Sequence, residues 1–597
     1  MLGKLIHRGP DGKGFYHDDF ISLAHSRLSI MDISDASAQP FVDPSERYVL
    51  VFNGEIYNFL EIKKELPLYD FKSEGDSEVL IAAFAAWGIS CVNKFNGIFA
   101  FAIWDKVEQI LWLARDRMGV KPLYFSIKNN TCVFASEIRS MLASGLVDHR
   151  IDKRTVSGYL QYQSAGYPAT FIQDVQEIPP GNYAKISQLG SEFTTYYKLY
   201  PENIGYRQTI NPENLRKELF RILNEAVSSR LQGVVPVGVF LSGGIDSSAV
   251  VALASLHASS SLNTFTLTID EKGFDESKEA EDFARLYRTN HHAIKMHPDD
   301  CQHQVSAFLS NVDSPSLDGL NTYLISAAAA KAGMKVMLSG LGGDELFAGY
   351  PGFRYAKLLE KWKLLFDNTQ YLRMNIASLL QSSKSSFAFG LYKILSAKTH
   401  HVHHCYPALR QMMSMADVSR FTSLEYSSSG IFANNLNAFQ NVDDYCISNY
   451  SLAELHYYVA NTLLRDNDQM GMANSLEIRE PFFDQQLIEF MLGLPDTYKL
   501  SKYPKQLLID TLNPLLPKNI NRRPKKGFVL PMDRWMHSSL YDVCNQAILS
   551  LSAYDFVDFE HVHNAWKQFS RGRSAEKWTT IWSFVVLGSW LQKNNIN

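Results

Sequence analysis

A glycine-rich turn follows an apolar run near the middle of the chain, and its residues have the properties of a phosphate-binding loop. Val235 to Leu241 is continuously apolar and is followed by Ser-Gly-Gly-Ile-Asp-Ser-Ser at 242–248. Glycines let backbone N–H groups approach an anion, and a helix that starts here directs its positive end toward it. Ser242 and Ser247 can donate hydroxyl hydrogen bonds, and Asp246 could hold the magnesium ion that accompanies a nucleotide. An ordinary strand-to-helix turn without a ligand is the alternative, although the full string is more specific than a glycine pair.

A second glycine-rich turn repeats this pattern further along the chain. It reads Ser-Gly-Leu-Gly-Gly-Asp at 339–344 and follows the segment Lys335–Leu338. In an open α/β sheet the carboxyl ends of neighbouring strands meet at one crevice, so both turns could face one nucleotide, with Asp246 and Asp344 sharing the metal ion. The Walker sequence G-x-x-x-x-G-K-[ST] is absent, which disfavours a kinase or motor that transfers the γ-phosphoryl group.

The elements around these turns alternate between strand and helix patterns. We expect strands at Val235–Leu241, Thr264–Ile269 and Lys335–Leu338, and helices at Ser247–His257, Glu276–Leu286 and Tyr323–Lys331. This alternation predicts a parallel sheet with helices on both faces. From about residue 355 to the end, long amphipathic segments predict an all-helical region. The apolar segment Trp578–Leu591 is too short for a membrane span and is expected to be a buried helix.

The first part of the chain, up to about residue 195, has short β-rich runs separated by turn residues. The runs are Tyr48–Phe52, which precedes the turn pair Asn53-Gly54, and Ile98–Trp104, Ile110–Ala114 and Leu123–Phe125. One amphipathic segment, Ser77–Trp87, predicts a helix that covers the sheet. The polar stretch from Tyr200 to Asn214 is the best candidate for a linker.

Composition and charge limit the class of protein. A chain of 597 residues with 46% hydrophobic and 20% charged residues is expected to fold into two domains or more. Its net charge of −4 lacks the positive field of a nucleic-acid or anionic-membrane binder, so we expect small-molecule partners, no nucleic acid and no membrane. The six cysteines are scattered without a C-x-x-C pair, and we find neither a signal peptide nor a transmembrane pattern. These features predict a soluble cytoplasmic protein.

Further motifs give a family resemblance over nearly the whole chain. In the first part they are His-Arg-Gly-Pro-Asp-Gly at 7–12, Arg-Leu-Ser-Ile at 27–30, Phe-Asn-Gly-Glu-Ile-Tyr-Asn at 52–58, Ala-Arg-Asp-Arg at 114–117 and Phe-Ala-Ser-Glu at 134–137. In the second part they are the two turns, Leu463–Arg465, the segment 472–482 and Arg-Pro-Lys-Lys-Gly-Phe at 523–528. The chain resembles the glutamine-dependent asparagine synthetase family, in which a class II glutamine amidotransferase domain precedes an ATP-pyrophosphatase synthetase domain.

The resemblance implies a fold of class α+β followed by α/β. A four-layer αββα amidotransferase domain of the Ntn type, N-terminally incomplete, is expected over residues 1–198, with a linker at 199–214. Residues 215–597 would form the synthetase domain, a doubly wound parallel sheet with a large helical carboxy-terminal part. A homodimer is plausible in this family.

The resemblance also implies ATP-dependent amide formation, with ATP and Mg²⁺ as cofactors. A carboxylate, expected to be that of aspartate, would attack the α-phosphate of ATP to give an acyl-adenylate and pyrophosphate; ammonia, free or from glutamine, would then give the amide and AMP. By resemblance the ATP-binding residues are Leu241, Ser242, Gly243, Gly244, Asp246, Ser247, Leu267, Ser339 and Gly340, and the magnesium ligands are Asp246 and Asp344. Lys505 would stabilise charge on phosphate and carbonyl oxygens; a solvated surface lysine is the alternative.

In the amidotransferase half, the resemblance implies glutamine-binding residues at Arg27, Leu28, Ser29, Ile30, Asn53, Gly54, Glu55 and Asp76. Arg27 would bind the glutamine carboxylate and Asp76 its amino group, because an amino acid needs such a pair of opposite charges. Asn53 and Gly54 would donate to an oxyanion. A turn or salt-bridge role is the alternative for Arg27, Asn53 and Asp76.

The sequence departs from the family at its start. The family's nucleophile is an amino-terminal cysteine in Met-Cys-Gly-Ile, some tens of residues before His-Arg-Gly-Pro-Asp, whereas here Met1 lies six residues before His7. Either the sequence starts at an internal methionine of a longer protein, which we favour, or the glutaminase has been lost. As written, the chain is not expected to hydrolyse glutamine.

The second departure is Leu341, where asparagine synthetases usually carry an acidic residue and β-lactam synthetases a tyrosine. Leucine can neither accept a proton nor position an amine. Aspartate remains the first expectation for the acceptor, and the alternatives are another carboxylate, such as a uronic acid in surface-polysaccharide synthesis, or a β-lactam-synthetase-like ligase. Glu477 is either a catalytic carboxylate or the salt-bridge partner of Arg479.

Two other interpretations of the sequence are a nucleotide-binding scaffold without activity and a metal site at the histidine-rich segment. A catalytically silent scaffold that binds a nucleotide is the alternative outside the enzymes, and the intact turns argue against it. The histidines within His400–Cys405 invite a metal site. Consecutive positions on one short segment rarely converge on one ion, however, so we disfavour it.

Overall fold

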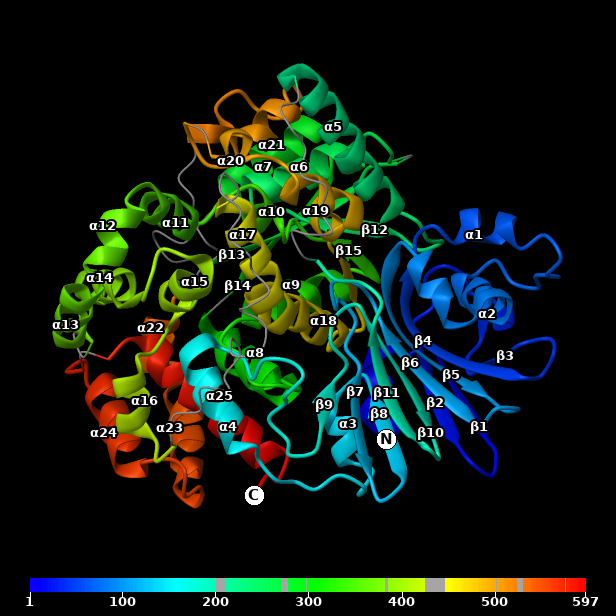
Figure 1. Ribbon diagram of the computed structural model, residues 1–597, viewed down its shortest axis with the longest axis horizontal. Helices are drawn as coiled ribbons and strands as arrows, with labels where there is room; N and C mark the ends of the chain where they lie inside the picture. Colours follow the sequence, from blue (N-terminus) through cyan, green and yellow to red (C-terminus); the bar gives the residue numbers. More distant parts are fainter. Residues whose placement is uncertain are drawn as a thin grey trace.

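The computed structural model describes residues 1–199, 211–258, 260–269, 277–296, 298–381, 385–424, 446–500, 502–522, 530–574 and 576–597. Most of the predicted linker and the whole motif at 523–528 lie outside the described residues. Figure 1 shows the sheets of the amino-terminal half on one side of the molecule and the helical carboxy-terminal region on the other. Within the described ranges, no helix is both long enough and apolar enough to cross a membrane.

The amino-terminal half is built on a six-stranded antiparallel sheet with the strand order β11-β10-β6-β5-β4-β3. On one face lie α1 and α2, and Leu80 and Phe84 of α2 share an apolar core with Phe52 and Phe101 of the sheet. The bounds are β3 Phe41–Val42, β4 Tyr48–Ile56, β5 Gly97–Asp105, β6 Ile110–Arg115, β10 Asn182–Ser187, β11 Gly190–Thr195, α1 Phe59–Glu65 and α2 Asp76–Trp87.

A second β layer covers the other face of this sheet. It consists of the hairpin β1–β2 and the three-stranded sheet β8-β7-β9. Leu23 and Phe125 from this layer share an apolar core with Val51 and Leu113 of the six-stranded sheet, and α3 packs on the outer side of β8. The succession of helix, sheet, sheet and helix confirms the predicted αββα layering. The bounds are β1 Gly12–His17, β2 Ser22–Arg27, β7 Tyr124–Lys128, β8 Thr131–Ala135, β9 Gln176–Glu177, α3 Ile138–Leu142 and α4 Lys153–Tyr162.

The prediction of a turn at Asn53-Gly54 is wrong. β4 continues through both residues to Ile56 and is paired with β5 throughout. Gly54 has a φ of +139°, and a Cβ atom there would overlap the carbonyl oxygen of Ile98 on β5. The glycine therefore permits a close approach of two backbones instead of a chain reversal.

The carboxy-terminal half contains a five-stranded sheet in which every pair is parallel, in the order β14-β13-β12-β15-β16. On one face α5, α6 and α7 share a core with Val239 and Leu338, and on the other α9 packs against Phe265 and Met337. This is the predicted doubly wound arrangement, with β12 at the switch point because β13 and β15 lie on its opposite sides. The bounds are β12 Val237–Phe240, β13 Asn263–Ile269, β14 Asn290–Met296, β15 Val336–Leu338, β16 Glu477–Arg479, α5 Pro212–Ser229, α6 Ile245–Ser255, α7 Ser277–Tyr287 and α9 Leu320–Lys331.

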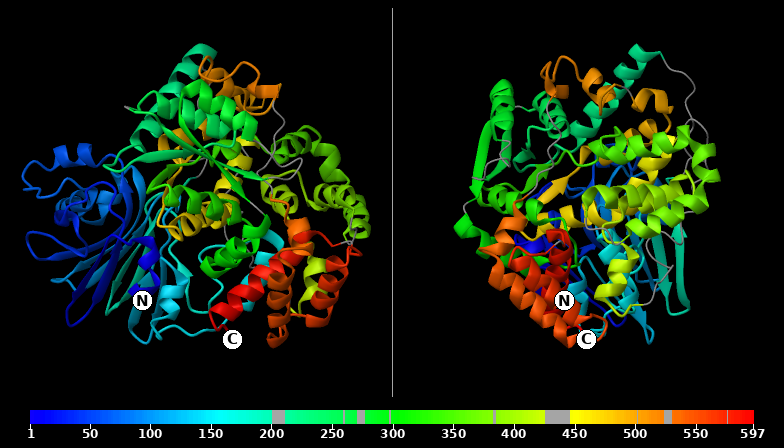
Figure 2. Two further views of the ribbon diagram at one scale, coloured as in Figure 1. Left: turned by 180° about the vertical axis from the view of Figure 1, so that it is seen from behind. Right: turned by 90° about the vertical axis from the view of Figure 1, so that its left-hand side faces the viewer.

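Beyond about residue 355 the described residues form helices and loops, as predicted, apart from the short strand β16. The segment Trp578–Leu591 lies within the buried helix α25. Helices α11 to α15, which we call the outer lobe, lie at the rim of the molecule away from the amino-terminal half (Figures 1 and 2). The bounds are α8 Pro298–Asn311, α10 Gly343–Leu346, α11 Pro351–Lys361, α12 Lys363–Asn368, α13 Gln370–Leu380, α14 Ser386–Ser396, α15 Val402–Arg410, α16 Met415–Phe421, α17 Cys446–Ala453, the π-helical η7 Glu454–Leu463, α18 Leu464–Met472, α19 Gln485–Leu492, α20 Asp496–Lys499, α21 Gln506–Thr511, α22 Met532–His537, α23 Tyr541–Ser550, α24 Phe559–Ser570 and α25 Trp578–Lys593.

Candidate active site

The first glycine-rich turn lies between β12 and α6, at the switch point of the parallel sheet. Leu241 is buried, and its N–H donates to the carbonyl oxygen of Phe265 on β13 at 2.8 Å. Gly243 has a φ of +73°, a conformation that glycine adopts without strain. The Ser247 hydroxyl accepts the Ser242 N–H at 3.2 Å, and the two hydroxyl oxygens lie 3.1 Å apart. The turn therefore brings two hydroxyl groups to the amino terminus of α6, as an anion site requires.

The second turn, after β15, packs directly against the first. A Cβ atom on Gly340 would lie 2.7 Å from the backbone nitrogen of Ser247, and one on Gly343 would overlap the Asp246 carboxylate. Only glycine fits at these two positions, because any side chain would separate the turns. The Ser339 hydroxyl accepts the Leu341 N–H at 3.3 Å. The structure thus brings together the two turns that the sequence places almost 100 residues apart.

The other predicted nucleotide-binding residues border these turns. Gly244 is exposed at the cap of α6, and Leu267 is buried on the neighbouring strand β13. The Thr266 hydroxyl, beside Leu267, donates to the carbonyl oxygen of Leu241. This contact fixes the end of β12 against β13.

Lys505 reaches both turns from a third, distant segment. Its ammonium group contacts the Asp246 carboxylate and lies 2.6 Å from Oδ1 of Asp344. The residue is only 6% exposed, so it is not the solvated surface lysine that the sequence left open. It has a φ of +59° at the start of α21, a strained conformation that a non-glycine residue keeps only where its surroundings enforce it.

The two carboxylates stabilise the protonated, charged form of Lys505. Burial alone would lower the pKa of Lys505, but the carboxylates of Asp246 and Asp344 outweigh it and raise that pKa above its usual range. Two carboxylates that converge on one point supply the hard oxygen ligands that Mg²⁺ prefers. The donor set of the two turns therefore fits a magnesium ion, which would compete with the ammonium group for the same oxygens.

Glu345 is a titratable neighbour that the sequence analysis did not single out. Burial and the nearby carboxylates of Asp344 and Glu454 raise its pKa to about 7, and the Tyr350 hydroxyl donates to it at 2.8 Å. Leu341 packs against the core of this half. The only sequence signal for Glu345 is its place in Gly-Asp-Glu-Leu-Phe, where it continues a helical turn.

The predicted glutamine-binding residues line one cavity of about 660 Å³ in the amino-terminal half. The guanidinium of Arg27 donates to the backbone carbonyls of Asp32 and Ser34 at 2.6 and 2.8 Å, so its orientation is fixed by its own loop. The residues that line the cavity include all eight of that set, Arg27, Leu28, Ser29, Ile30, Asn53, Gly54, Glu55 and Asp76.

Asp76 and Glu55 are buried carboxylates at the inner side of this cavity. Asp76 begins α2 and accepts the Ile56 N–H at 2.8 Å, and its pKa is raised to about 6 because burial outweighs that hydrogen bond. Glu55 pairs with Arg479 of the other half at 3.0 Å, yet burial raises its pKa well above the usual range. Carboxylates with raised pKa values in a cavity are typical of binding sites.

Glu477 belongs to a buried charge network between the two halves. Its carboxylate accepts from Arg479 at 2.8 Å and from Lys121 of the amino-terminal half at 3.1 Å. These cations outweigh burial and lower the pKa of Glu477. The geometry thus supports the salt-bridge interpretation of Glu477, although Glu477 and Met472 also line the cavity described above.

Arg8 and Lys121 continue the network and were not predicted as interface residues. Arg8 contacts Glu137 at 3.1 Å and Asp468 at 2.8 Å, and Lys121 is 2% exposed. Arg8 lies in the family motif at 7–12, whereas Lys121 lies in none of the motifs that the sequence analysis named. Burial of unpaired charges is costly, so these pairs couple the two halves.

His400 has a carboxylate partner, since its Nδ1 lies 2.7 Å from Asp367. Cys405 is buried. Among the residues described, no group of three or more histidine, cysteine, aspartate or glutamate side chains is placed to hold a metal ion.

Comparison with known proteins assigns both halves. Residues 218–592, more than half of the chain, match the family described as asparagine synthase. The chain belongs to the asparagine synthase family. Residues 1–197 match the glutamine amidotransferase domain.

Curated relatives of this asparagine synthase family member extend over almost its whole length. "Asparagine synthetase [glutamine-hydrolyzing] 1" of Bacillus subtilis is 29% identical and covers 99% of this chain and 92% of its own. "Putative asparagine synthetase [glutamine-hydrolyzing]" of Mycobacterium bovis is 30% identical over 98% and 92%. "Amidase chry2" of Gibberella zeae is 27% identical over 98% and 93%. The family and its relatives therefore identify an ATP-dependent glutamine amidotransferase of the asparagine synthetase type. The similar proteins carry more than one name.

Proposed function

We propose that this protein forms a carboxamide from a carboxylate, most simply asparagine from aspartate, through an acyl-adenylate. The observation that carries the proposal is the convergence of Asp246, Asp344 and Lys505 from three segments on one point beside a phosphate-binding turn. Such a centre can bind the triphosphate of ATP and offset the charge that develops at its α-phosphate.

Each group of residues has its own role in the proposed reaction. The N–H groups and hydroxyls of the first turn bind the β- and γ-phosphates, and a magnesium ion held by Asp246 and Asp344 would neutralise the departing pyrophosphate. A carboxylate oxygen of the acceptor attacks the α-phosphorus, and the bond to pyrophosphate breaks. The Lys505 ammonium, once nucleotide is bound, stabilises charge on the phosphoryl and then the carbonyl oxygen. Ammonia attacks the acyl carbon, loses a proton, and AMP leaves with the former carboxylate oxygen.

The amino-terminal cavity would bind glutamine as the source of this ammonia. Arg27 would bind the α-carboxylate and Asp76, once ionised, the α-ammonium group. Asn53 and Gly54 lie on β4 where their groups border the same cavity. Free ammonium supplies nitrogen without this half, so the two activities can be assayed separately.

A larger carboxylate is the second candidate acceptor, and two observations favour it. Leu341 supplies no polar group at the second turn, and a cavity of about 510 Å³ is lined by Tyr350, whose hydroxyl donates to Glu345, the residue after Asp344. Aromatic and aliphatic side chains such as Tyr355, Phe387 and Leu391 line it together with Arg410. A uronic acid or another extended acid, or a β-lactam-synthetase-like substrate, would use such a space better than aspartate.

The test is exchange of labelled pyrophosphate into ATP in the presence of magnesium and one carboxylate at a time. We expect exchange that depends on the carboxylate, with aspartate first and uronic acids next, and amide formation on adding ammonium. Exchange with a uronic acid alone would select the second candidate. ATP binding without exchange for any carboxylate would instead indicate a silent nucleotide-binding scaffold and would overturn the proposal.

A further inference from the structure

The outer lobe contains a helix whose apolar side faces outward. In α13, Arg373 and Ala377 are buried, whereas Tyr371, Leu372 and Leu379 are each more than half exposed. This orientation is opposite to that of an ordinary surface helix, which buries its apolar stripe.

Specific contacts hold α13 in this orientation. The Arg373 guanidinium donates to the backbone carbonyls of Phe366, Leu395 and Ala397 at 2.9 Å each, and it lies over the Phe366 ring at 3.4 Å. Rotation of the helix to bury its leucines would break these three hydrogen bonds and leave a guanidinium unsatisfied. The outward apolar side is therefore a fixed feature of the fold.

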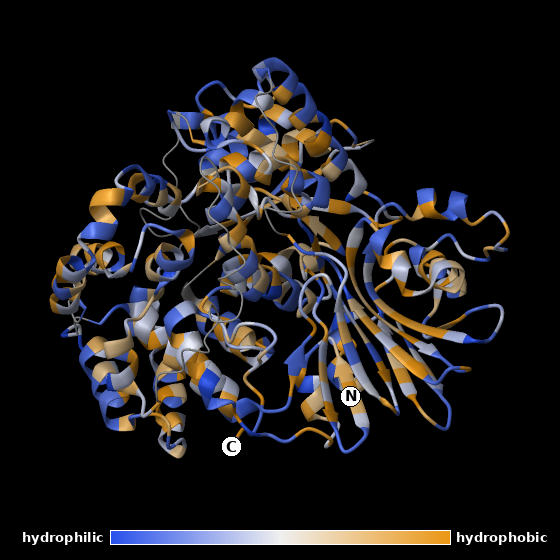
Figure 3. Cartoon of the chain, viewed as in Figure 1, coloured by the Kyte–Doolittle hydropathy of each residue, from blue (hydrophilic) through white to orange (hydrophobic). Residues whose placement is uncertain are grey.

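Neighbouring helices extend this apolar surface. Trp362 precedes α12, Leu364 lies on α12 and Phe387 lies on α14, and each is more than half exposed. Figure 3 shows hydrophobic residues along the rim formed by α12 and α13. We define Trp362, Leu364, Tyr371, Leu372, Leu379 and Phe387 as the apolar surface. Scattered exposed leucines are normal, but a concentration of this kind on adjoining helices marks a contact site.

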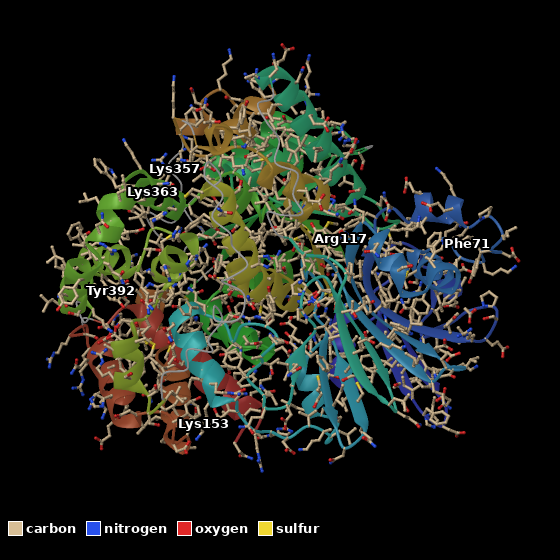
Figure 4. The ribbon with its side chains drawn as sticks, viewed as in Figure 1. Phe71, Arg117, Lys153, Lys357, Lys363 and Tyr392 are labelled. Atoms are coloured by element: carbon tan, nitrogen blue, oxygen red, sulfur yellow. The ribbon has the colours of Figure 1, made fainter. Side chains whose placement is uncertain are left out.

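The segment of the chain that carries the apolar surface is rich in positive charge. Residues 351–398 contain eight Lys and Arg (positions 354, 357, 361, 363, 373, 384, 393 and 398) and two acidic residues (360 and 367), whereas the whole chain has a net charge of −4. The lobe that carries these charges is seen in Figure 4, where Lys357, Lys363 and Tyr392 are labelled.

Part of this charge is not balanced by carboxylates. The two acidic residues already pair, Glu360 with Lys363 and Asp367 with His400. Lys361 is exposed, as are Arg354 and Lys398, and no ion pair connects these three cations to a carboxylate within the described part of the chain.

We propose that the apolar surface and its cations bind the surface of an anionic lipid bilayer. Tryptophan, tyrosine and leucine side chains that project beside lysine and arginine are the chemistry of helices that lie in a membrane interface. Anionic headgroups attract each nearby cation. A second copy of this chain is a poorer occupant, because a two-fold interface would bring the same positive charges together.

This proposal replaces the expectation, drawn from the net charge, that the protein has no membrane partner. Charges farther away than about 8–10 Å are largely screened at physiological salt. The attraction to a membrane therefore depends on the charge of the outer lobe and not on the net charge of the whole chain. The cavity next to Tyr350 has Tyr355, Phe387 and Leu391 among its lining residues, and these are exposed on the same lobe. A bilayer on the apolar surface would therefore cover this end of the cavity.

Vesicle co-sedimentation of the full chain tests the proposal. Vesicles of phosphatidylcholine with about a third phosphatidylglycerol should bind the protein, and vesicles of phosphatidylcholine alone should bind it at least tenfold more weakly. The triple variant Tyr371→Ser, Leu372→Ser, Leu379→Ser should reduce binding by roughly tenfold or more. The matched control is Leu68→Ser with Leu189→Ser, since both leucines are fully exposed outside the lobe.

A second variant keeps the test independent of the apolar residues. Arg354→Gln with Lys361→Gln and Lys398→Gln should weaken binding to the anionic vesicles by roughly tenfold to a hundredfold, with pyrophosphate exchange unchanged. The proposal is overturned if wild-type protein does not bind anionic vesicles, or if either variant binds them as well as the control does. It is also overturned if the serine variant converts a dimer to a monomer in sedimentation equilibrium while vesicle binding is absent, because the occupant is then a second copy.

Discussion

Replacement of Lys505 by methionine perturbs the proposed reaction centre most sharply. Methionine has a similar length but no charge, so Asp246 and Asp344 lose the cation that they share. We expect AMP formation with ammonium as nitrogen donor to fall by about 10²–10³-fold, the usual effect of removing one group that stabilises charge in a transition state. The substitution should affect catalysis more than ATP binding, because the ammonium group contacts the developing charge.

The same substitution has a calculable effect on stability. Breaking a buried ion pair costs about 3–5 kcal/mol, but the side chains of Asp246 and Asp344 remain 17% and 20% exposed. Water reaches them and reduces the cost, so we expect a loss of about 2 kcal/mol in the free energy of unfolding. Magnesium should restore most of this loss, because a divalent ion replaces the missing charge and stabilises the state that binds it.

Urea unfolding with and without magnesium, together with AMP release, measures both effects. Lys502→Met is the matched control, because Lys502 is exposed close by on the same segment. It should match wild type in both assays. If Lys505→Met forms AMP within about threefold of wild type and gains no stability from magnesium, the assignment of Lys505 and the two carboxylates to one centre is refuted.

Three further predictions concern the turns, the glutamine cavity and the interface. Gly343→Ala should weaken ATP binding, measured by calorimetry, by more than roughly tenfold, because a Cβ atom there overlaps the first turn; Gly3→Ala, with open space around the new atom, should have no effect. Glutamine binding should weaken as the pH falls through about 6, because burial raises the pKa of Asp76 to that value and only its ionised form attracts an ammonium group. Lys121→Met should lower the free energy of unfolding in denaturant by about 3–5 kcal/mol, whereas Lys128→Met, which removes an exposed pair, should cost less than about 1 kcal/mol.

For each of these predictions, one result would contradict the reasoning. Equal ATP affinity in Gly343→Ala and Gly3→Ala would separate the turn contact from nucleotide binding. A glutamine affinity that does not change across pH 6, with normal binding in Asp76→Asn, would exclude this carboxylate from the recognition of glutamine. Equal losses of stability in Lys121→Met and Lys128→Met would mean that the buried network does not couple the two halves.

The sequence predicted the strands and helices whose pattern is set by local burial. The predicted bounds of β12 and α6 agree with the structure within two residues, because an apolar run and an alanine-rich helix have few alternatives. β14 was missed, because its polar sequence Asn-His-His at 290–292 lies at the edge of the sheet, where burial is incomplete. β16 was missed because Glu477 and Arg479 are charged, and their burial is compensated by Lys121 and Glu55 of the other half.

Some properties of the site could also be predicted from the sequence, and others could not. Asp246 and Asp344 were predicted to meet from the rule that neighbouring parallel strands end at one crevice, and the structure shows Lys505 touching both. Lys505 was assigned to this centre only by the family resemblance, because its direction follows from the packing of a segment far away in sequence. Asn53-Gly54 shows how a local pattern can lead to a wrong prediction. A dipeptide typical of a turn remains in a strand when a neighbouring backbone requires the close approach that glycine allows.

Transfer of ¹⁸O from the acceptor carboxylate to AMP tests the central claim most directly. The protein is incubated with ATP, magnesium, ammonium and a carboxylate, aspartate first, labelled in its carboxylate oxygens, and the AMP is analysed by mass spectrometry. Activation through an acyl-adenylate predicts AMP that contains one ¹⁸O atom for each amide formed, because the oxygen that attacks the α-phosphorus remains on it. Amide formation with unlabelled AMP, or label in inorganic phosphate with ADP as the product, would contradict the account.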